Sequence, residues 1–237
     1  GKYDEAMPYF AEALETRRRV LGDEHPETLE SIGNMGVLLY LQGKYDEAME
    51  YTTEALEIRR RVLGDEHSDT LASINNMGVI LSDQGKYDEA MEYTTEALET
   101  QRRVLGDEHP ETLNSINNMG ALLQKQGKYD DAMAYYTEAL EVQHRVLGDE
   151  HPQALSSIAN MGVLLQKQGK YDEAMAYYTE VLKGRRRVLG DEHPDTLVAQ
   201  LNVCINLKDM GSFREAHQEA IKCHAFYETV YGPNHQE

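Results

Sequence analysis

The stretch Gly-Lys-Tyr-Asp-Glu-Ala at 43–48 decides the fold, because it returns at a fixed interval of 42 residues. Its copies begin at Gly1, Gly43, Gly85, Gly127 (as Gly-Lys-Tyr-Asp-Asp-Ala), Gly169 and, in the divergent form Gly-Ser-Phe-Arg-Glu-Ala, Gly211. A second motif, Leu-Gly-Asp-Glu-His, keeps the same interval from Leu21 to Leu189. A fixed period of about 20–50 residues is typical of stacked repeat arrays. The sequence therefore predicts one elongated array over 1–237, and it favours binding over catalysis.

Composition excludes several classes of partner. The 237 residues include 42 acidic and 23 basic side chains, a formal net charge of −19. Such a surface repels phosphate backbones, so nucleic acid is not an expected partner. The sequence has no run of about 18 apolar residues, so we expect no membrane span, and it shows no charged-then-apolar segment of the kind expected of a signal peptide. Two cysteines, Cys204 and Cys223, make no disulfide framework, so we expect a reducing, cytoplasmic location. Because Gly1 lies inside a repeat, we interpret the chain as a fragment.

One repeat reads as two helices. Apolar residues recur at helical spacing from Glu27 to Gln42, a segment we name helix A, after which Gly43 ends the helix. A second amphipathic segment, helix B, runs from Lys44 to Leu63 and ends at Gly64. Each helix has one apolar face, so the two are expected to pair antiparallel and to stack on the next pair. The fold class expected is all-α, an α-solenoid of helix pairs.

Two further features have structural interpretations. Glycines stand in the middle of helix A, where we expect close approach to small residues of helix B such as Ala48 or Ala55; they are Gly36, Gly78, Gly120 and Gly162. Arginine clusters near the end of helix B suit the helix dipole. We expect i,i+4 pairs there, such as Glu57 with Arg61. Polyanion binding by these clusters is the alternative.

The pattern Gly-x-x-x-x-x-x-Gly-Lys-Tyr-x-x-Ala, from Gly36 to Ala48, resembles the tetratricopeptide repeat. Helix B is longer here, and the 42-residue form with Leu-Gly-Asp-Glu-His-Pro, Asn-Asn-Met-Gly and Gln-Gly-Lys-Tyr is similar to the repeats of kinesin light chains. The resemblance implies a right-handed superhelix whose concave side is lined by helix A. We divide the chain into a half repeat, four repeats and a C-terminal capping repeat, at 1–26, 27–68, 69–110, 111–152, 153–194 and 195–237.

The resemblance also implies a binding groove. An asparagine stands nine residues before each repeat glycine, at Asn34, Asn76, Asn118, Asn160 and Asn202. In tetratricopeptide proteins the matching asparagine holds the backbone of an extended peptide. A side-chain amide both donates and accepts, so it can bind a peptide unit without reading its side chain. The alternative is that these amides bond neighbouring backbone or one another, or are shared only through duplication.

Neighbouring groove positions would supply specificity. An apolar floor is expected at Val37, Val79, Ala121 and Val163, and polar contacts at Asn75, Asn117, Lys125 and Lys167. The charges along the predicted groove cancel. Basic residues that clamp a carboxylate in related adaptors are missing at the matching places, where Gly33 and Glu30 stand in the first repeat. We therefore carry over neither that mode nor the cargo binding of kinesin light chains.

Catalysis is not expected. Six histidines stand at the repeat interval, at His25, His67, His109, His151, His193 and His235, and all but the last follow an acidic Asp-Glu connector. Copies one repeat apart are too distant to share an ion, so we expect a loop or helix-entry role and no metal. No phosphate loop, nucleophile elbow or His-Glu-x-x-His motif occurs. We predict no cofactor and no enzyme activity.

The function expected is a protein-interaction scaffold that holds an extended peptide or partner segment in the helix-A groove. The alternative is a structural spacer or an array that self-associates end to end. A third interpretation is the sensor arm of a larger signalling ATPase. The sequence does not name the partner.

Overall fold

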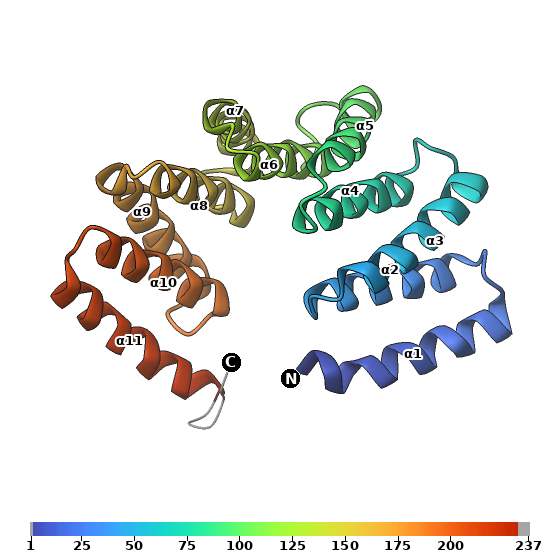
Figure 1. The fold of residues 1–237 in the computed structure, drawn as a ribbon, viewed down its shortest axis with the longest axis horizontal. Helices are drawn as coiled ribbons and strands as arrows, with labels where there is room; N and C mark the ends of the chain where they lie inside the picture. Colours follow the sequence, from blue (N-terminus) through green and yellow to red (C-terminus); the bar gives the residue numbers. More distant parts are fainter. Residues whose placement is uncertain (1, 232–237) are drawn as a thin grey trace. The chain divides into compact units, whose positions relative to one another are not determined.

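The computed structural model describes the backbone of residues 2–231 and the side chains of residues 3–224. His235 lies outside the described residues. The described chain forms eleven helices (Figure 1) and no strand. The helices A are α2 Pro26–Leu41, α4 Ser68–Asp83, α6 Pro110–Lys125, α8 Pro152–Lys167 and α10 Pro194–Asp209. The helices B are α1 Lys2–Leu21, α3 Tyr45–Leu63, α5 Tyr87–Leu105, α7 Tyr129–Leu147, α9 Tyr171–Leu189 and α11 Phe213–Tyr231.

The helices fall into two compact units, Gly1–Gln126 and Gly127–Glu237. In the first unit, contacts run in chain order from α1 to α6, and α4 also contacts α6. In the second unit, contacts run in order from α7 to α11. Each unit is thus a stack of adjacent helices, and the prediction of an all-α fold built from 42-residue repeats is confirmed.

The repeat glycines end the helices as expected. Gly43 has a φ of +74°, a conformation open to glycine at little cost, and it separates α2 from α3. The predicted close approach in the middle of helix A is also confirmed. A Cβ built on Gly36 would lie 2.7 Å from Thr52 Oγ1 and 3.4 Å from the carbonyl oxygen of Ala48. The nearest neighbour is therefore Thr52, and not the alanine that the sequence suggested.

The arginine clusters join successive repeats. Arg18 Nη2 lies 2.7 Å from Glu54 Oε1 on the next helix B. Arg61 reaches back to the preceding connector, where its Nη2 lies 2.8 Å from Glu24 Oε1. The i,i+4 partner expected for Arg61, Glu57, is not the carboxylate that it binds. The pair of Arg61 with Glu24 is exposed and contributes only about 0.2–1 kcal/mol, whereas the pair of Arg18 with Glu54 is half-buried.

The repeated histidines begin the helices A. His25, His67, His109, His151 and His193 are the N-cap residues, and each Nδ1 accepts from the backbone N–H two residues further on. For His67 the Nδ1 lies 3.1 Å from the nitrogen of Asp69. An N-cap side chain satisfies one of the backbone donors left open in the first turn. The helix-entry interpretation is confirmed for these five described histidines.

We expect the substitution His67→Ala to destabilise the chain by about 0.5–2 kcal/mol, because the cap of α4 is lost. The effect should exceed that of His109→Ala, because Pro110 at the first position of α6 already favours the helical backbone, whereas α4 begins with Ser68. Urea unfolding measures both. His67→Asn restores a capping oxygen, so an Asn variant as unstable as the Ala variant would contradict the assignment.

Candidate binding face

The predicted ladder asparagines in the first unit lie on three helices A: Asn34 on α2, Asn76 on α4 and Asn118 on α6. Asn34 and Asn76 are exposed, and Asn118 is half-buried. Among the residues that the structure describes, none of these three amides has a hydrogen-bond partner. The hydrogen bond from Tyr40 to Asp83 holds the C-terminal ends of α2 and α4 together. The first unit therefore presents amides with free donors and acceptors on neighbouring helices.

The second unit repeats this arrangement with two members. Asn160 lies on α8 and Asn202 on α10, both half-buried. Within the described part of the chain neither amide is hydrogen-bonded. Gln166 of α8 donates to Asp209 of α10 with Nε2 and Oδ2 2.7 Å apart, which places these helices side by side.

Asn75 and Asn117 are engaged within the fold. Asn75 Nδ2 donates to Ser115 Oγ of α6 at 2.6 Å, and Asn117 Nδ2 donates to the carbonyl of Leu113 at 3.1 Å. Ser115 in turn donates to the side-chain oxygen of Gln101, which is almost fully buried. The amide of Asn75 therefore joins neighbouring repeats, a role that the sequence analysis missed.

The matching place in the preceding repeat is built differently. Arg59 stands one repeat before Gln101 and takes its place, and its Nη1 lies 2.6 Å from Ser73 Oγ. Its Nη2 lies 3.4 Å from the carbonyl of Leu29. Gly33 stands where the other copy has Asn75, and a Cβ built there would be in van der Waals contact with this guanidinium, at 3.5 Å from Nη2. Glycine thus faces arginine in one copy, and asparagine accompanies glutamine in the next. This exchange is visible in the sequence and could have identified Asn75 as structural.

Lys125, predicted as a groove contact, is neutralised in the first unit. Its ammonium forms an ion pair with Asp83, which also accepts from Tyr40 Oη at 2.6 Å. Burial, followed by the hydrogen bond to Asp83, raises the pKa of Tyr40 well above its ordinary value. Lys167, at the corresponding place on α8, is exposed and has no printed partner among the described side chains. The two predicted lysines are therefore not equivalent.

In the second unit a buried tyrosine of α9 joins the C-terminal ends of α8 and α10. Tyr178 of α9 is 1% exposed, and its hydroxyl donates to Gln166 Oε1 at 2.6 Å. The Nε2 of Gln166 in turn donates to Asp209. Burial raises the pKa of Tyr178 to about 12, with a smaller contribution from Asp209. The phenol is therefore neutral near neutral pH and acts as a donor.

The predicted apolar floor is partly accessible. Val37 is 42% exposed, whereas Val79, Ala121 and Val163 are half-buried. All four lie on helices A, three residues after a ladder asparagine. Apolar surface therefore accompanies each free amide.

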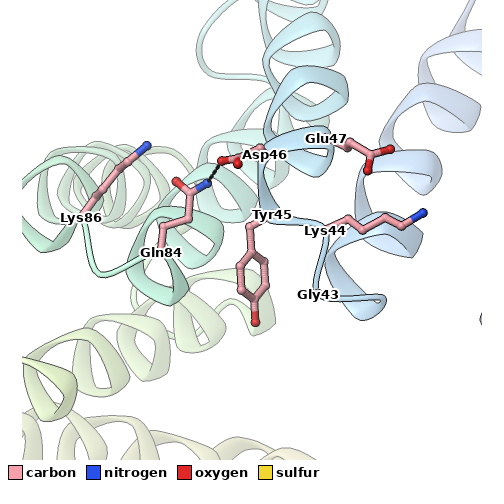
Figure 2. A pocket seen from close by; sticks show the side chains of 7 residues that line it. All are labelled: Gly43, Lys44, Tyr45, Asp46, Glu47, Gln84 and Lys86. Atoms are coloured by element: carbon pink, nitrogen blue, oxygen red, sulfur yellow. Dashed lines mark hydrogen bonds between the residues drawn. The ribbon is translucent and has the colours of Figure 1, made fainter.

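The most repeated motif forms the joint between helices A and B. Residues 43–47 with Gln84 and Lys86 line a hollow of about 430 Å³ (Figure 2). Gln84 Nε2 donates to Asp46 Oδ1 at 2.8 Å across it. A similar hollow of about 390 Å³ is lined by residues 169–173 and Met210. No ladder asparagine lines either of these two hollows.

Two chemical features are missing from the described part of the chain. Within residues 2–231 no helix combines the length and the apolar character needed to cross a bilayer. The same described residues hold no group of three or more His, Cys, Asp or Glu side chains that could hold a metal ion.

The repeats of this chain are similar to those of known proteins. The sequence profile of the tetratricopeptide repeat matches residues 1–61, 34–100, 69–143, 115–186 and 154–229. No curated protein sequence matches the chain. Similar solved structures include a putative kinesin light chain with nearly identical TPR-like repeats from Podosopora anserina, with 25% identity and a TM-score of 0.66, covering 87% of this chain and 98% of that one.

Two other structures share the fold. BtubC (BKLC) from P. vanneervenii is 22% identical with a TM-score of 0.73, and the match covers 100% of this chain and 96% of that one. NprR in complex with its cognate peptide NprX is 18% identical with a TM-score of 0.69, and the match covers 91% of this chain and 61% of that one.

Proposed function

The chain belongs to the tetratricopeptide repeat family, and from this premise we propose that it is a non-enzymatic scaffold whose helices A bind an extended peptide or partner segment. The ladder asparagines bind the backbone of the partner. The apolar residues beside them, Val37, Val79, Ala121 and Val163, accept its apolar side chains. The partner is a protein or a peptide.

One observation carries this proposal. The ladder amides are free of partners in the described residues, whereas other polar side chains on the same helices are used within the fold. Asn75 and Lys125 are examples of the engaged class, bound to Ser115 and Asp83. Five such amides with no internal partner are available to a ligand, and a peptide unit matches their donor and acceptor.

The solved relatives support the proposal at the level of ligand class. NprR shares the fold, and its structure contains the cognate peptide NprX. Hydrogen bonds from the amides contribute about 0.5–1.5 kcal/mol each. Backbone recognition alone therefore gives weak binding, on the order of 100 μM once ordering costs are included. Specificity comes from the residues that differ between copies.

The test is selection of peptides from a random library, followed by affinity measurement on variants. We expect Asn34→Ala, Asn76→Ala and Asn118→Ala, combined in the first unit, to weaken an enriched peptide at least about tenfold, from the loss of three hydrogen bonds. Asn160→Ala with Asn202→Ala tests the second unit in the same way.

The chain supplies a matched control. Asn75→Ala removes the same side chain one residue away from Asn76, but it breaks the contact to Ser115 instead. It should lower stability and leave peptide affinity unchanged. Retention of full affinity by the triple variant would refute the asparagine ladder, and enrichment of no peptide at all would refute peptide binding.

End-to-end self-association is the rival function. Sedimentation at several concentrations separates the two functions. A mass that stays at one chain would dismiss self-association.

A further inference from the structure

One carboxylate joins the C-terminal ends of three successive helices A in the first unit. Asp83 of α4 accepts from Tyr40 of α2, whose Oη lies 2.6 Å from its Oδ2. The other oxygen of Asp83, Oδ1, forms the ion pair with Lys125 of α6. Each carboxylate oxygen therefore holds a different neighbouring helix. We name Tyr40, Asp83 and Lys125 the rim network.

The rim network occupies the same three helices as the ladder asparagines of the first unit. Each of its members follows the asparagine of its own helix by six or seven residues, as Asp83 follows Asn76. Seven residues make two helical turns, a rise of about 10 Å. The network is therefore too far along the helices to share the peptide unit that an asparagine binds. It can act on that site by setting where the helices lie.

The joint between α2 and α4 depends on the rim network for its polar contact. Within residues 3–224, whose side chains are described, Tyr40 with Asp83 is the one hydrogen bond or ion pair between these two helices. Leu39 of α2 and Ile80 of α4 share a cluster of buried apolar side chains. Apolar contact is non-directional, whereas a hydrogen bond prefers one distance and one angle. Tyr40 therefore fixes α2 against α4.

The joint between α4 and α6 is held twice. Lys125 supplies one link, to Asp83. Asn75 supplies another, because its Nδ2 donates to Ser115 Oγ at 2.6 Å. The two joints therefore differ in how far they depend on the rim network, and α2 is the helix that depends on it more.

The rim network is partly shielded from water. The side chain of Asp83 is 21% exposed and that of Lys125 is 35% exposed, so solvent screens their attraction less than that of a fully exposed pair. Burial, followed by the hydrogen bond to Asp83, raises the pKa of Tyr40 well above its ordinary value. Its hydroxyl therefore stays protonated near neutral pH and keeps donating to the carboxylate.

We propose that Asp83 is a positioning residue of the peptide-binding face. It holds α2 and α6 in place beside α4, so that the three ladder amides of the first unit meet one extended peptide without first rearranging. Prealigned binding groups lower the ordering cost of association. This inference rests on the proposed function, because it concerns the same peptide site.

Double-mutant cycles on the full chain test the proposal, with a library-selected peptide whose affinity is measured well below the urea and temperature of unfolding. Tyr40→Phe removes only the hydroxyl and should weaken the peptide about fivefold. Asn34→Ala should weaken it by a similar factor in the native chain, but less than about twofold when Tyr40→Phe is present, because the amide on α2 is then already misplaced. Asn118→Ala should have the same effect in both backgrounds.

Lys125→Met is the matched comparison. It removes one of the two links between α4 and α6, and the contact of Asn75 with Ser115 remains. This variant should weaken the peptide less than about twofold, although it removes a charge and Tyr40→Phe does not. A merely structural role of the network would lower the stability of both variants and leave their peptide affinities unchanged.

The proposal is overturned if Tyr40→Phe binds the peptide as tightly as the native chain, or if the effects of Tyr40→Phe and Asn34→Ala simply multiply. Both of those results leave the asparagines as binding residues. If no peptide is enriched, or if the asparagine variants keep full affinity, extended-peptide binding itself is refuted and the positioning role falls with it. The two failures are therefore distinguishable.

Discussion

Replacing Gly78 by a large residue should destabilise the chain more than most single substitutions. A Cβ at this position would lie 2.6 Å from Thr94 Oγ1, and Thr94 is held by a 2.8 Å hydrogen bond to the carbonyl of Ala90. Overpacking a filled interface costs about 1–3 kcal/mol and occasionally more. We expect Gly78→Leu to lose about 3 kcal/mol, measured by urea unfolding, despite the higher helix propensity of leucine.

The last repeat offers the matched control for this prediction. Cys204 replaces the mid-helix glycine there, and Ala220 replaces the threonine that faces it in α5. Cys204 is 6% exposed, so the exchange is accommodated within the helix pair. Gly78→Cys alone should therefore destabilise the first unit, and Thr94→Ala added to it should recover more than half of the loss. Strictly additive losses would show that contact with Thr94 is not the cause.

The fold was predictable from the sequence because its signals are local and repeated. Gly43 and Gly64 end helices by backbone conformation alone, and the apolar spacing between them indicates which faces pair. The histidine caps were also predictable as helix entries, since each stands directly before a helix A. These features depend on residues within a few positions of one another.

The roles of polar side chains on the helices A were harder to predict. Asn75 and Asn76 are adjacent and chemically identical, but among the described side chains only Asn75 has a partner, Ser115, forty residues away. Lys125 and Lys167 occupy corresponding places, but only Lys125 meets a carboxylate. Such differences depend on which residue the neighbouring repeat presents. They appear in the sequence only as exchanges between copies, as when Gly33 with Arg59 becomes Asn75 with Gln101.

Those exchanges lead to the second large prediction, that the two inter-repeat contacts can be interchanged. Arg59→Gln alone removes the bonds from the guanidinium to Ser73 and Leu29, while Gly33→Asn alone places an amide beside the same guanidinium, which occupies the place of its partner. We expect each single variant to lose about 1–3 kcal/mol, the usual cost of leaving buried polar groups unpaired. The double variant rebuilds the arrangement of Asn75, Ser115 and Gln101 around Ser73.

The double variant should therefore be more stable than either single variant, although it carries both changes. Urea unfolding of the four proteins of the double-mutant cycle should give a coupling free energy of about 1 kcal/mol or more. The reverse pair, Asn75→Gly with Gln101→Arg, should behave in the same way one repeat further along. Additive losses in both cycles would mean that these positions act independently. A positive coupling in both would show that the copies differ by exchange of whole contacts, because an asparagine or an arginine stabilises this joint only when its partner changes with it.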